Sequence, residues 1–169
     1  DRPALHSIEH LDYCPDVVHG MPAGATAVLC EYQAATAEAL EQLFASAKKE
    51  IDRMPLLAKV DFTTDTQHQA KLWKIRKGLY PSVAAVRDKG TTAMLEDVAV
   101  PLEHLGNAVT DLHELFIKYA YDNAIIFGHA KEGNLHFLIT QPVNTQQDLT
   151  VFEQFNDDLA DMIIRKYNG

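Results

Sequence analysis

The sequence predicts an α+β domain in which helices pack on one face of an antiparallel sheet of ferredoxin-like type. Short apolar, strand-like runs alternate with segments whose apolar residues recur every three to four positions, giving the order β-α-β-α-β-α-β-β-α. The last two strand-like runs are separated by only four residues, a spacing that joins antiparallel neighbours. No GxGxxG or GxxxxGK[ST] motif follows a predicted strand, which argues against a doubly wound nucleotide-binding fold.

The first third of the chain contains an irregular lead-in and one predicted β-α-β unit. Residues 1–24 are polar and interrupted by proline and glycine, with room for a short helix near 4–11. The runs 25–33 and 56–64 alternate as strands do. Between them, residues 36–52 have helical spacing, and Thr36 is in place to cap the helix.

The remaining elements follow in the same way. A helix begins at Thr64 or Asp65 and is expected to break or kink at Pro81 before resuming through VAAVRD. The other predicted elements are a strand at 92–100, a helix from Pro101 to 122, a hairpin of strands 124–129 and 134–140, and a helix at 147–167.

Composition bounds the classes of function. The chain has 169 residues, 47% of them hydrophobic, which is enough for a single domain with its own core. A net charge of −9 without a basic cluster argues against nucleic acid or an anionic membrane surface as a partner. No run reaches the ~18 apolar residues of a membrane helix. Two cysteines without metal-site spacing predict reduced thiols in a cytoplasmic protein, with Cys30 buried. The abrupt start, DRPALH, and end, RKYNG, suggest a fragment of a longer protein.

The stretch GHAKEGNLHF, residues 128–137, is the strongest candidate site. With a turn of four residues His129 lies opposite Asn134, and with six it faces His136; in both registers all three share one face of the hairpin. Directly opposed Cβ atoms are ~5 Å apart and diagonal ones ~7 Å. Either arrangement lets two imidazoles reach one ion at ~2.0–2.1 Å. The alternative is that both histidines only form hydrogen bonds at a polar strand end.

Two further motifs carry chemistry. Trp73, Arg76 and Tyr80 share a helix face, where an arginine beside aromatic rings could clamp a carboxylate or could instead pack its stem on Trp73 and pair with a surface acid. Glu96 and Asp97 interrupt an apolar strand, either as a base or ligand or as charges that protect a sheet edge.

In this order and at these separations, W-x-x-R at 73–76, EDVAVP at 96–101 and GHAKEGNLHF resemble the C-terminal, substrate-capping domain of FAD-linked oxidases, the group of D-lactate, glycolate and D-2-hydroxyglutarate dehydrogenases. The resemblance covers nearly the whole chain, residues 1–169, as one substrate-binding domain. It rests above all on the GH-x-x-(D/E)-GNLH hallmark. The EDVAVP wording is closest to large members that are fused to an iron–sulfur region.

The resemblance implies a flavin-dependent enzyme that oxidises a D-2-hydroxy acid to the 2-keto acid. A flavin domain outside this chain would bind most of the FAD, and the electron acceptor is not specified. His129 and His136 would bind a divalent ion, typically zinc, with His136 catalytic. Arg76 would bind the substrate carboxylate, Asn134 would help orient it, and Tyr80 would lie beside it. The isolated fragment would be inactive.

The same resemblance has gaps. The glutamate–histidine–glycine segment that supplies a third ligand and a base in the family would begin where this chain stops, at Gly169. Leu95 and Tyr80 replace a lysine and a small hydroxyl residue of some relatives, which leaves the hydroxy acid open. The alternatives are a stand-alone, non-catalytic ligand- or metal-binding module, and a metal-free oxidase whose hairpin is scaffold. We expect a cytoplasmic protein, with the periphery of the inner membrane as the other location that the family allows.

Overall fold

The centre of the molecule is a three-stranded antiparallel sheet. The computed structural model describes residues 1–60 and 62–169, apart from the side chains of residues 83, 85 and 86. The strands are β1 (Thr91–Ala99), β2 (Ile125–His129) and β3 (Asn134–Pro142), and β3 lies between the other two. Both neighbours pair with β3 in the antiparallel sense, so the two strands of the hairpin are β2 and β3.

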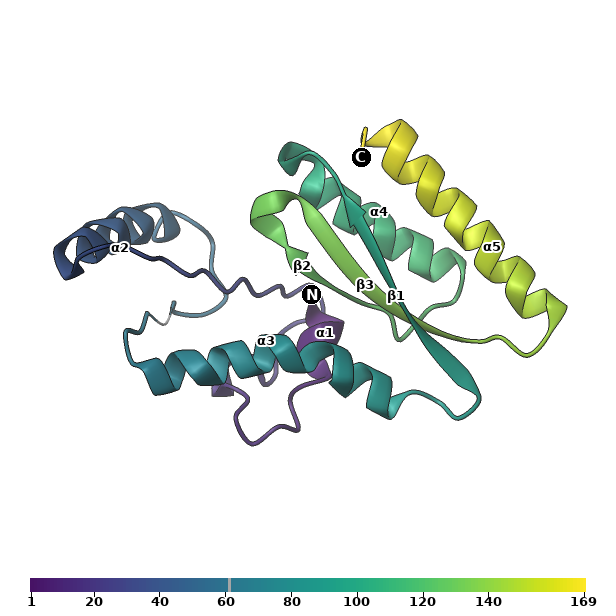
Figure 1. Ribbon diagram of the computed structural model, residues 1–169, viewed down its shortest axis with the longest axis horizontal. Coiled ribbons are helices and arrows are strands. Elements are labelled where there is room, and N and C mark those ends of the chain that lie inside the picture. Colours follow the sequence, from purple (N-terminus) through teal and green to yellow (C-terminus); the bar gives the residue numbers. More distant parts are fainter. Residues whose placement is uncertain (61) are drawn as a thin grey trace.

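Two helices complete this unit. α4 (Leu105–Lys118) connects β1 to β2 after a short 3-10 turn, and α5 (Gln146–Ala160) follows β3 (Figure 1). The order β-α-β-β-α, with β3 between β1 and β2, supplies all but the last strand of a ferredoxin-like βαββαβ unit. The predicted α+β class and its antiparallel sheet are therefore confirmed. α5 begins with a capping box between Thr145 and Asp148, as expected for a helix start after a turn.

The main core lies between the sheet and the helices α4 and α5. Because side chains alternate along a strand, Leu135, Phe137 and Ile139 of β3 all face these helices and are buried. Phe155 of α5 lies at the centre, with ring centroids 5.0–6.3 Å from the rings of Phe116, Tyr121 and Phe137. Burying a side chain of this size contributes about 1.5–3 kcal/mol. This core holds β3, and with it the hairpin, in a fixed position.

A second, smaller layer covers part of the opposite face. It is formed by α1 (Arg2–His6), the chain that follows it, and α3 (Thr66–Val86). Ile8 and Leu79 pack there on Ile125 and Leu138 of the sheet. The sequence placed helices on one face only, and α1 and α3 add this layer because Ile125 and Leu138 make the second face apolar as well. α3 starts at its predicted cap, Asp65, and continues through Pro81 as one helix instead of breaking there.

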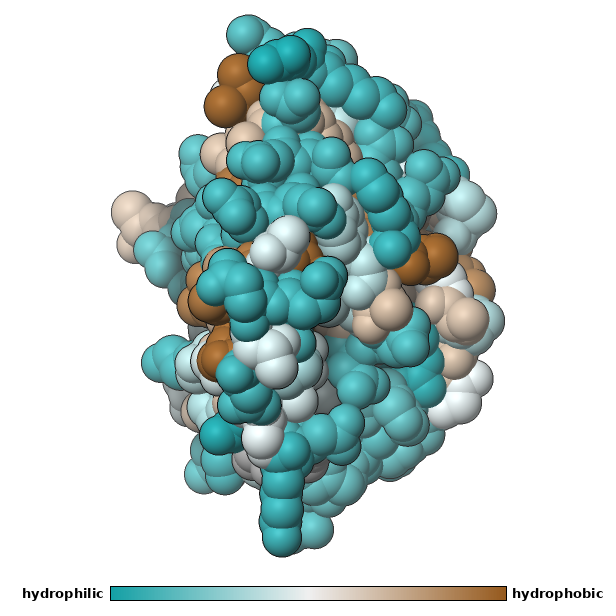
Figure 2. Space-filling model, turned by 90° about the vertical axis from the view of Figure 1, so that its right-hand side faces the viewer, coloured by the Kyte–Doolittle hydropathy of each residue, from teal (hydrophilic) through white to brown (hydrophobic). Residues whose placement is uncertain are grey.

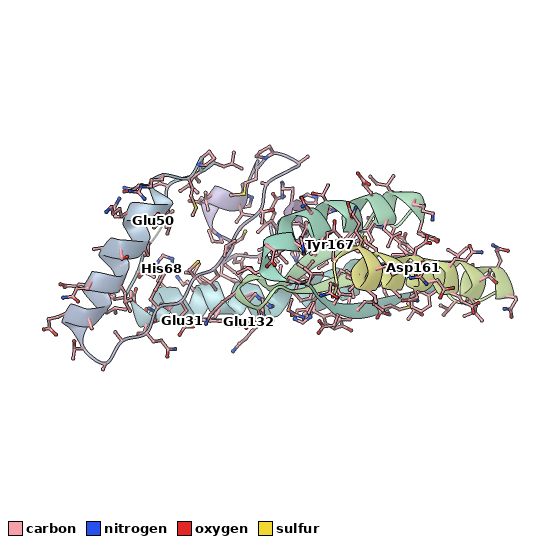
Figure 3. All side chains as sticks on the ribbon, turned by 90° about the horizontal axis from the view of Figure 1, so that it is seen from above. Glu31, Glu50, His68, Glu132, Asp161 and Tyr167 are labelled. Atoms are coloured by element: carbon pink, nitrogen blue, oxygen red, sulfur yellow. The ribbon has the colours of Figure 1, made fainter. Side chains whose placement is uncertain are left out.

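Residues 25–60 form an arm that is only loosely attached to this body. Its helix α2 (Ala37–Ile51) is capped by Thr36 as predicted, but none of its residues is buried. Figure 3 shows α2, marked by Glu50, at one end of the molecule, whereas Tyr167 lies near the middle of the view and the helix marked by Asp161 extends towards the other end. The packing of the Phe44 ring on Phe62, with centroids 4.2 Å apart, is the aromatic contact that α2 makes among the described residues.

Both strands predicted in this region are wrong. Residues 25–33 form no strand, and neither do the described residues of 56–64, residue 61 lying outside the description. The alternating pattern exists, but these segments pair with no other strand, and Val28 and Leu57 stay about two-thirds exposed, at 67% and 66%. Cys30 is exposed as well, which corrects its predicted burial.

The end of the molecule formed by α5 and the start of β1 is mainly hydrophilic, with isolated apolar side chains (Figure 2). Within the described residues, no helix is long and apolar enough to cross a membrane.

Candidate functional site at the β2–β3 hairpin

The hairpin turn has the four-residue form. His129 pairs with Asn134 and Phe127 with His136, so the six-residue alternative does not occur. Residues Ala130–Glu132 make a single 3-10 turn, and Gly133 closes it with φ 65° and ψ 17°. This left-handed conformation favours glycine, and a Cβ at Gly133 would also lie 2.0 Å from the carbonyl oxygen of Val100. Gly133 is thus required twice, by the turn and by the close approach of the chain that leaves β1.

The two hairpin histidines lie side by side on the face opposite the main core. Their ring centroids are 5.3 Å apart and their planes are nearly perpendicular, at 88°. His129 is exposed at the end of β2, whereas the side chain of His136 retains 20% of its exposure. The prediction that His129, Asn134 and His136 share one face is confirmed by the register.

Arg76 reaches this group from α3. Its guanidinium carbon lies 5.3 Å from the ring centroid of Phe127, and the Phe127 ring lies 5.5 Å from that of His136. Phe127 therefore connects the cation of α3 with the imidazoles of the hairpin, and the stacking on its ring face is itself favourable. Arg76 and His136 thus share Phe127 as a neighbour, and the expected joint role of Arg76 and the histidine pair stays a prediction.

The neighbours of Arg76 on α3 are less engaged. Trp73 and Tyr80 lie one turn to either side and keep 41% and 42% of their exposure. Tyr80 has no ring or hydrogen-bond contact with the hairpin among the described residues, so its predicted contact with the substrate stays a prediction. Leu95 of β1, at 49% exposure, lies on the same sheet face. The exposed Trp73, Tyr80 and Leu95 side chains are apolar or aromatic, in contrast to the charged Arg76 and the hairpin histidines.

Asp97 joins the site from β1. It is the register partner of His136, and its Oδ2 lies 3.0 Å from His136 Nδ1. Its other carboxylate oxygen accepts a hydrogen bond from the Asn134 amide nitrogen, which also donates to the Val98 carbonyl at 3.2 Å. Sequence reasoning gave Asp97 no partner, because the pairing of β1 with β3 spans some forty residues of chain that no local pattern reports.

The side chain of the adjacent residue, Glu96, lies in a different environment. Alternation along β1 turns it to the side of α4 and α5, where partial burial raises the pKa of its carboxyl group. The two acids that looked like a pair in the sequence therefore point to opposite faces of the sheet.

The hairpin face is open to solvent, because His129 is exposed and the Asp97 side chain is 59% exposed. Two hollows, of about 400 and 630 Å³, lie elsewhere: one between the lead-in and the first half of α3, the other beside α1 and the end of α3. Neither is lined by a hairpin histidine, by Asp97 or by Arg76. A ligand held at the hairpin face would need a cover from outside the described residues to exclude water.

The described residues can supply two ligands to a metal ion. A metal–nitrogen bond of ~2.0–2.1 Å places a ring centroid ~3.2 Å from the ion, so rings 5.3 Å apart can share one ion. No group of three or more His, Cys, Asp or Glu side chains suited to an ion occurs within residues 1–60 and 62–169. The imidazole pair fits a divalent ion as half of a site.

Comparison with known proteins places the chain in a family. A family model described as "FAD linked oxidases, C-terminal domain" matches residues 7–169. The chain is 28% identical over 160 residues to "Glycolate oxidase subunit GlcD" of Bacillus subtilis (strain 168). That alignment covers 91% of this chain and 31% of the relative, so the chain spans about a third of that protein's length. Given its fold, its hairpin and this match over almost all its residues, the chain belongs to the family of C-terminal domains of FAD linked oxidases.

Proposed function

We propose that the full-length protein is an FAD-dependent oxidoreductase that oxidises a D-2-hydroxy acid to the 2-keto acid, and that this chain is its substrate-binding cap. Family membership supports the flavin enzyme, and the relative named as a glycolate oxidase subunit supports a hydroxy acid. The single observation that carries the proposal is the convergence of Arg76 and His136 on Phe127, at one open face of the sheet.

Arg76 binds the carboxylate of the substrate. Its guanidinium lies over the Phe127 ring and forms no ion pair with any described carboxylate, so its planar fork remains for two carboxylate oxygens. Partial burial beside the aromatic ring lowers local screening and strengthens that pairing. Arg76 therefore fixes one end of a 2-hydroxy acid, and Tyr80 and Leu95 border the substituent at the other end.

The hydroxyl end lies towards the hairpin. Oxidation removes a hydride from the α-carbon and a proton from the hydroxyl oxygen, leaving a carbonyl. FAD, when bound, accepts the hydride with its two electrons. The proton leaves on the side of His136. Nε2 takes it, or else His136 and His129 would together hold a divalent ion that would make the hydroxyl more acidic, so that water takes the proton. In the second case, further ligands come from outside the described residues, and zinc suits the imidazole donors.

The substrate class is tested with the full-length protein reconstituted with FAD. We expect D-2-hydroxy acids to reduce an artificial electron acceptor, with L-isomers slower by at least tenfold. Replacing Arg76 by alanine should raise KM about 10- to 150-fold, because a charged hydrogen-bonded contact contributes roughly 1.5–3 kcal/mol. If neither D- nor L-2-hydroxy acids reduced the acceptor through the reconstituted enzyme, the proposal would be contradicted.

The role of the ion is decided by metal analysis of the same preparation. One equivalent of divalent metal, lost in the His129→Ala and His136→Ala variants and retained in the exposed control His19→Ala, supports a metal-dependent oxidation. A metal-free preparation with full activity assigns His136 as the proton acceptor without an ion. An iron–sulfur region elsewhere in the parent protein stays a prediction.

A further inference from the structure

We infer that Asp97 is a positioning residue, which decides which atoms the hairpin face offers to a substrate. The inference rests on the proposed function and refines it. Asp97 contacts two hairpin side chains through separate oxygens: Oδ2 lies 3.0 Å from His136 Nδ1, and Oδ1 accepts from Asn134 Nδ2. A carboxylate only accepts hydrogen bonds, so it dictates the donor and acceptor pattern of both partners.

The first consequence concerns Asn134. Its amide nitrogen carries two hydrogens, and the contacts with Asp97 and with the Val98 carbonyl use both. Neither partner can donate, so turning the amide over would place its oxygen against two acceptors. The amide oxygen, Oδ1, is the atom left for a ligand. Asn134 thus accepts a hydrogen bond from the substrate hydroxyl, and in this way it helps to orient the substrate.

The second consequence concerns His136. With Asp97 Oδ2 beside it, Nδ1 carries the hydrogen of the neutral ring, and Nε2 keeps its lone pair. This tautomer is needed both for a base and for a metal ligand, and carboxylates commonly orient ligating histidines in this way. Asp97 therefore prepares His136 for either version of the proposed chemistry.

Together these contacts give the face a defined polarity. It offers two neutral acceptors, His136 Nε2 and Asn134 Oδ1, and the Arg76 cation lies across the Phe127 ring, which packs beside His136. A 2-hydroxy acid has the matching groups, one hydroxyl donor and one carboxylate. A 2-keto acid keeps the carboxylate but has lost the hydroxyl donor. While Nε2 is unprotonated, the face therefore offers it no hydrogen bond at that end and binds it less well than the hydroxy acid.

The experiment reads the His136 tautomer directly. Full-length protein with ¹⁵N-labelled histidine is studied at pH 8 by long-range ¹H–¹⁵N correlation, and the His136 signals are assigned by their loss in His136→Ala. We expect the Nδ1–H tautomer in the wild type and a mixture in Asp97→Asn, with kcat/KM for the hydroxy acid lowered about 10- to 100-fold. Asp97→Glu, which keeps a carboxylate, should restore part of both.

Glu96→Gln is the matched control, because it removes the same charge from the adjacent residue on the other face of β1. It should change neither tautomer nor kcat/KM. An Nε2–H tautomer in the wild type would overturn the inference, and so would an Asp97→Asn variant that loses activity with its tautomer unchanged. If the tautomer responds but no hydroxy acid is turned over, the positioning role stands and the proposed function fails.

Discussion

At the scale of single residues, the buried pair of Tyr121 and Gln141 shows how the main core tolerates polar atoms. Gln141 retains only 5% exposure, and its side-chain oxygen accepts a hydrogen bond from the Tyr121 hydroxyl. Burial raises the pKa of Tyr121 to about 12, so the phenol remains a donor far above neutral pH. The Gln141 amide nitrogen donates to the Asp148 carbonyl at 3.2 Å, which ties β3 to the start of α5.

Removing that hydroxyl should therefore destabilise the fold without touching the site. In Tyr121→Phe the Gln141 oxygen stays buried with no donor, which costs roughly 1–3 kcal/mol in the free energy of unfolding. Urea denaturation measures it, with the exposed Tyr32→Phe as control, for which we expect a change below about 0.5 kcal/mol. Equal stability of the two variants would show that the Tyr121 hydroxyl contributes nothing.

At the scale of elements, α4 and α5 are joined by two similar contacts, which we call clasps, each between an aspartate of one helix and a lysine and a tyrosine at the end of the other. Lys118 and Tyr119 at the end of α4 both contact Asp158 of α5, and the Tyr119 hydroxyl donates to it at 2.6 Å. Lys166 and Tyr167, after α5, contact Asp111 of α4 in the same way, again with a 2.6 Å hydroxyl bond. Hydrogen bonds from the lysine and then the tyrosine lower the pKa of each aspartate.

These lowered pKa values predict loss of stability in acid. A carboxyl group with a folded-state pKa below its ordinary value of 3.8 stabilises the fold fully above 3.8, and that contribution disappears as pH falls through the folded-state pKa. Asp158→Asn should lower Tm at pH 7, with the gap to wild type closing below pH 3.8. Asp157→Asn, on the same helix, is the control. A gap that is the same at pH 7 and pH 3 would contradict the clasp.

The arm shows the opposite balance between pattern and packing. Leu43 of α2 is 42% exposed, whereas Leu112 of α4 is fully buried. Leu112→Ala should therefore cost about 2–5 kcal/mol of unfolding free energy and Leu43→Ala less than about 1 kcal/mol. Limited proteolysis should cut first within residues 25–60, because local opening there breaks few contacts. Comparable costs at the two leucines would mean that the arm packs more firmly than the structure shows.

At the scale of the whole molecule, sequence patterns predicted the features that depend only on residues close together in the chain, such as helices, caps and turns. Helical periodicity and the Thr36 cap located α2, and the short polar spacer with Gly133 predicted the hairpin, although the spacing allowed a turn of four or of six residues. The same logic failed for 25–33 and 56–64, where alternation is present but no partner strand is. Strand pairing is a long-range property, which a local pattern can only suggest.

The candidate site divides along the same line. His129, Asn134 and His136 could be placed together from their spacing alone, since they belong to one hairpin. The contact of Arg76 with Phe127 and the bridge formed by Asp97 join elements far apart in sequence, and they became visible only in the folded chain. From the sequence alone, Glu96 and Asp97 could not be told apart as candidate site residues. Only the register of β1 with β3 shows that Asp97 belongs to the site.

The central claim is that the hairpin face acts on the hydroxyl of a bound hydroxy acid. The most direct measurement is the single-turnover rate of flavin reduction when full-length protein is mixed with a saturating D-2-hydroxy acid. For His136→Ala with an intact flavin spectrum, we predict a rate at least about 100-fold below wild type, in keeping with the loss of a group that handles the proton. A rate within twofold of wild type would remove the hairpin from the chemistry.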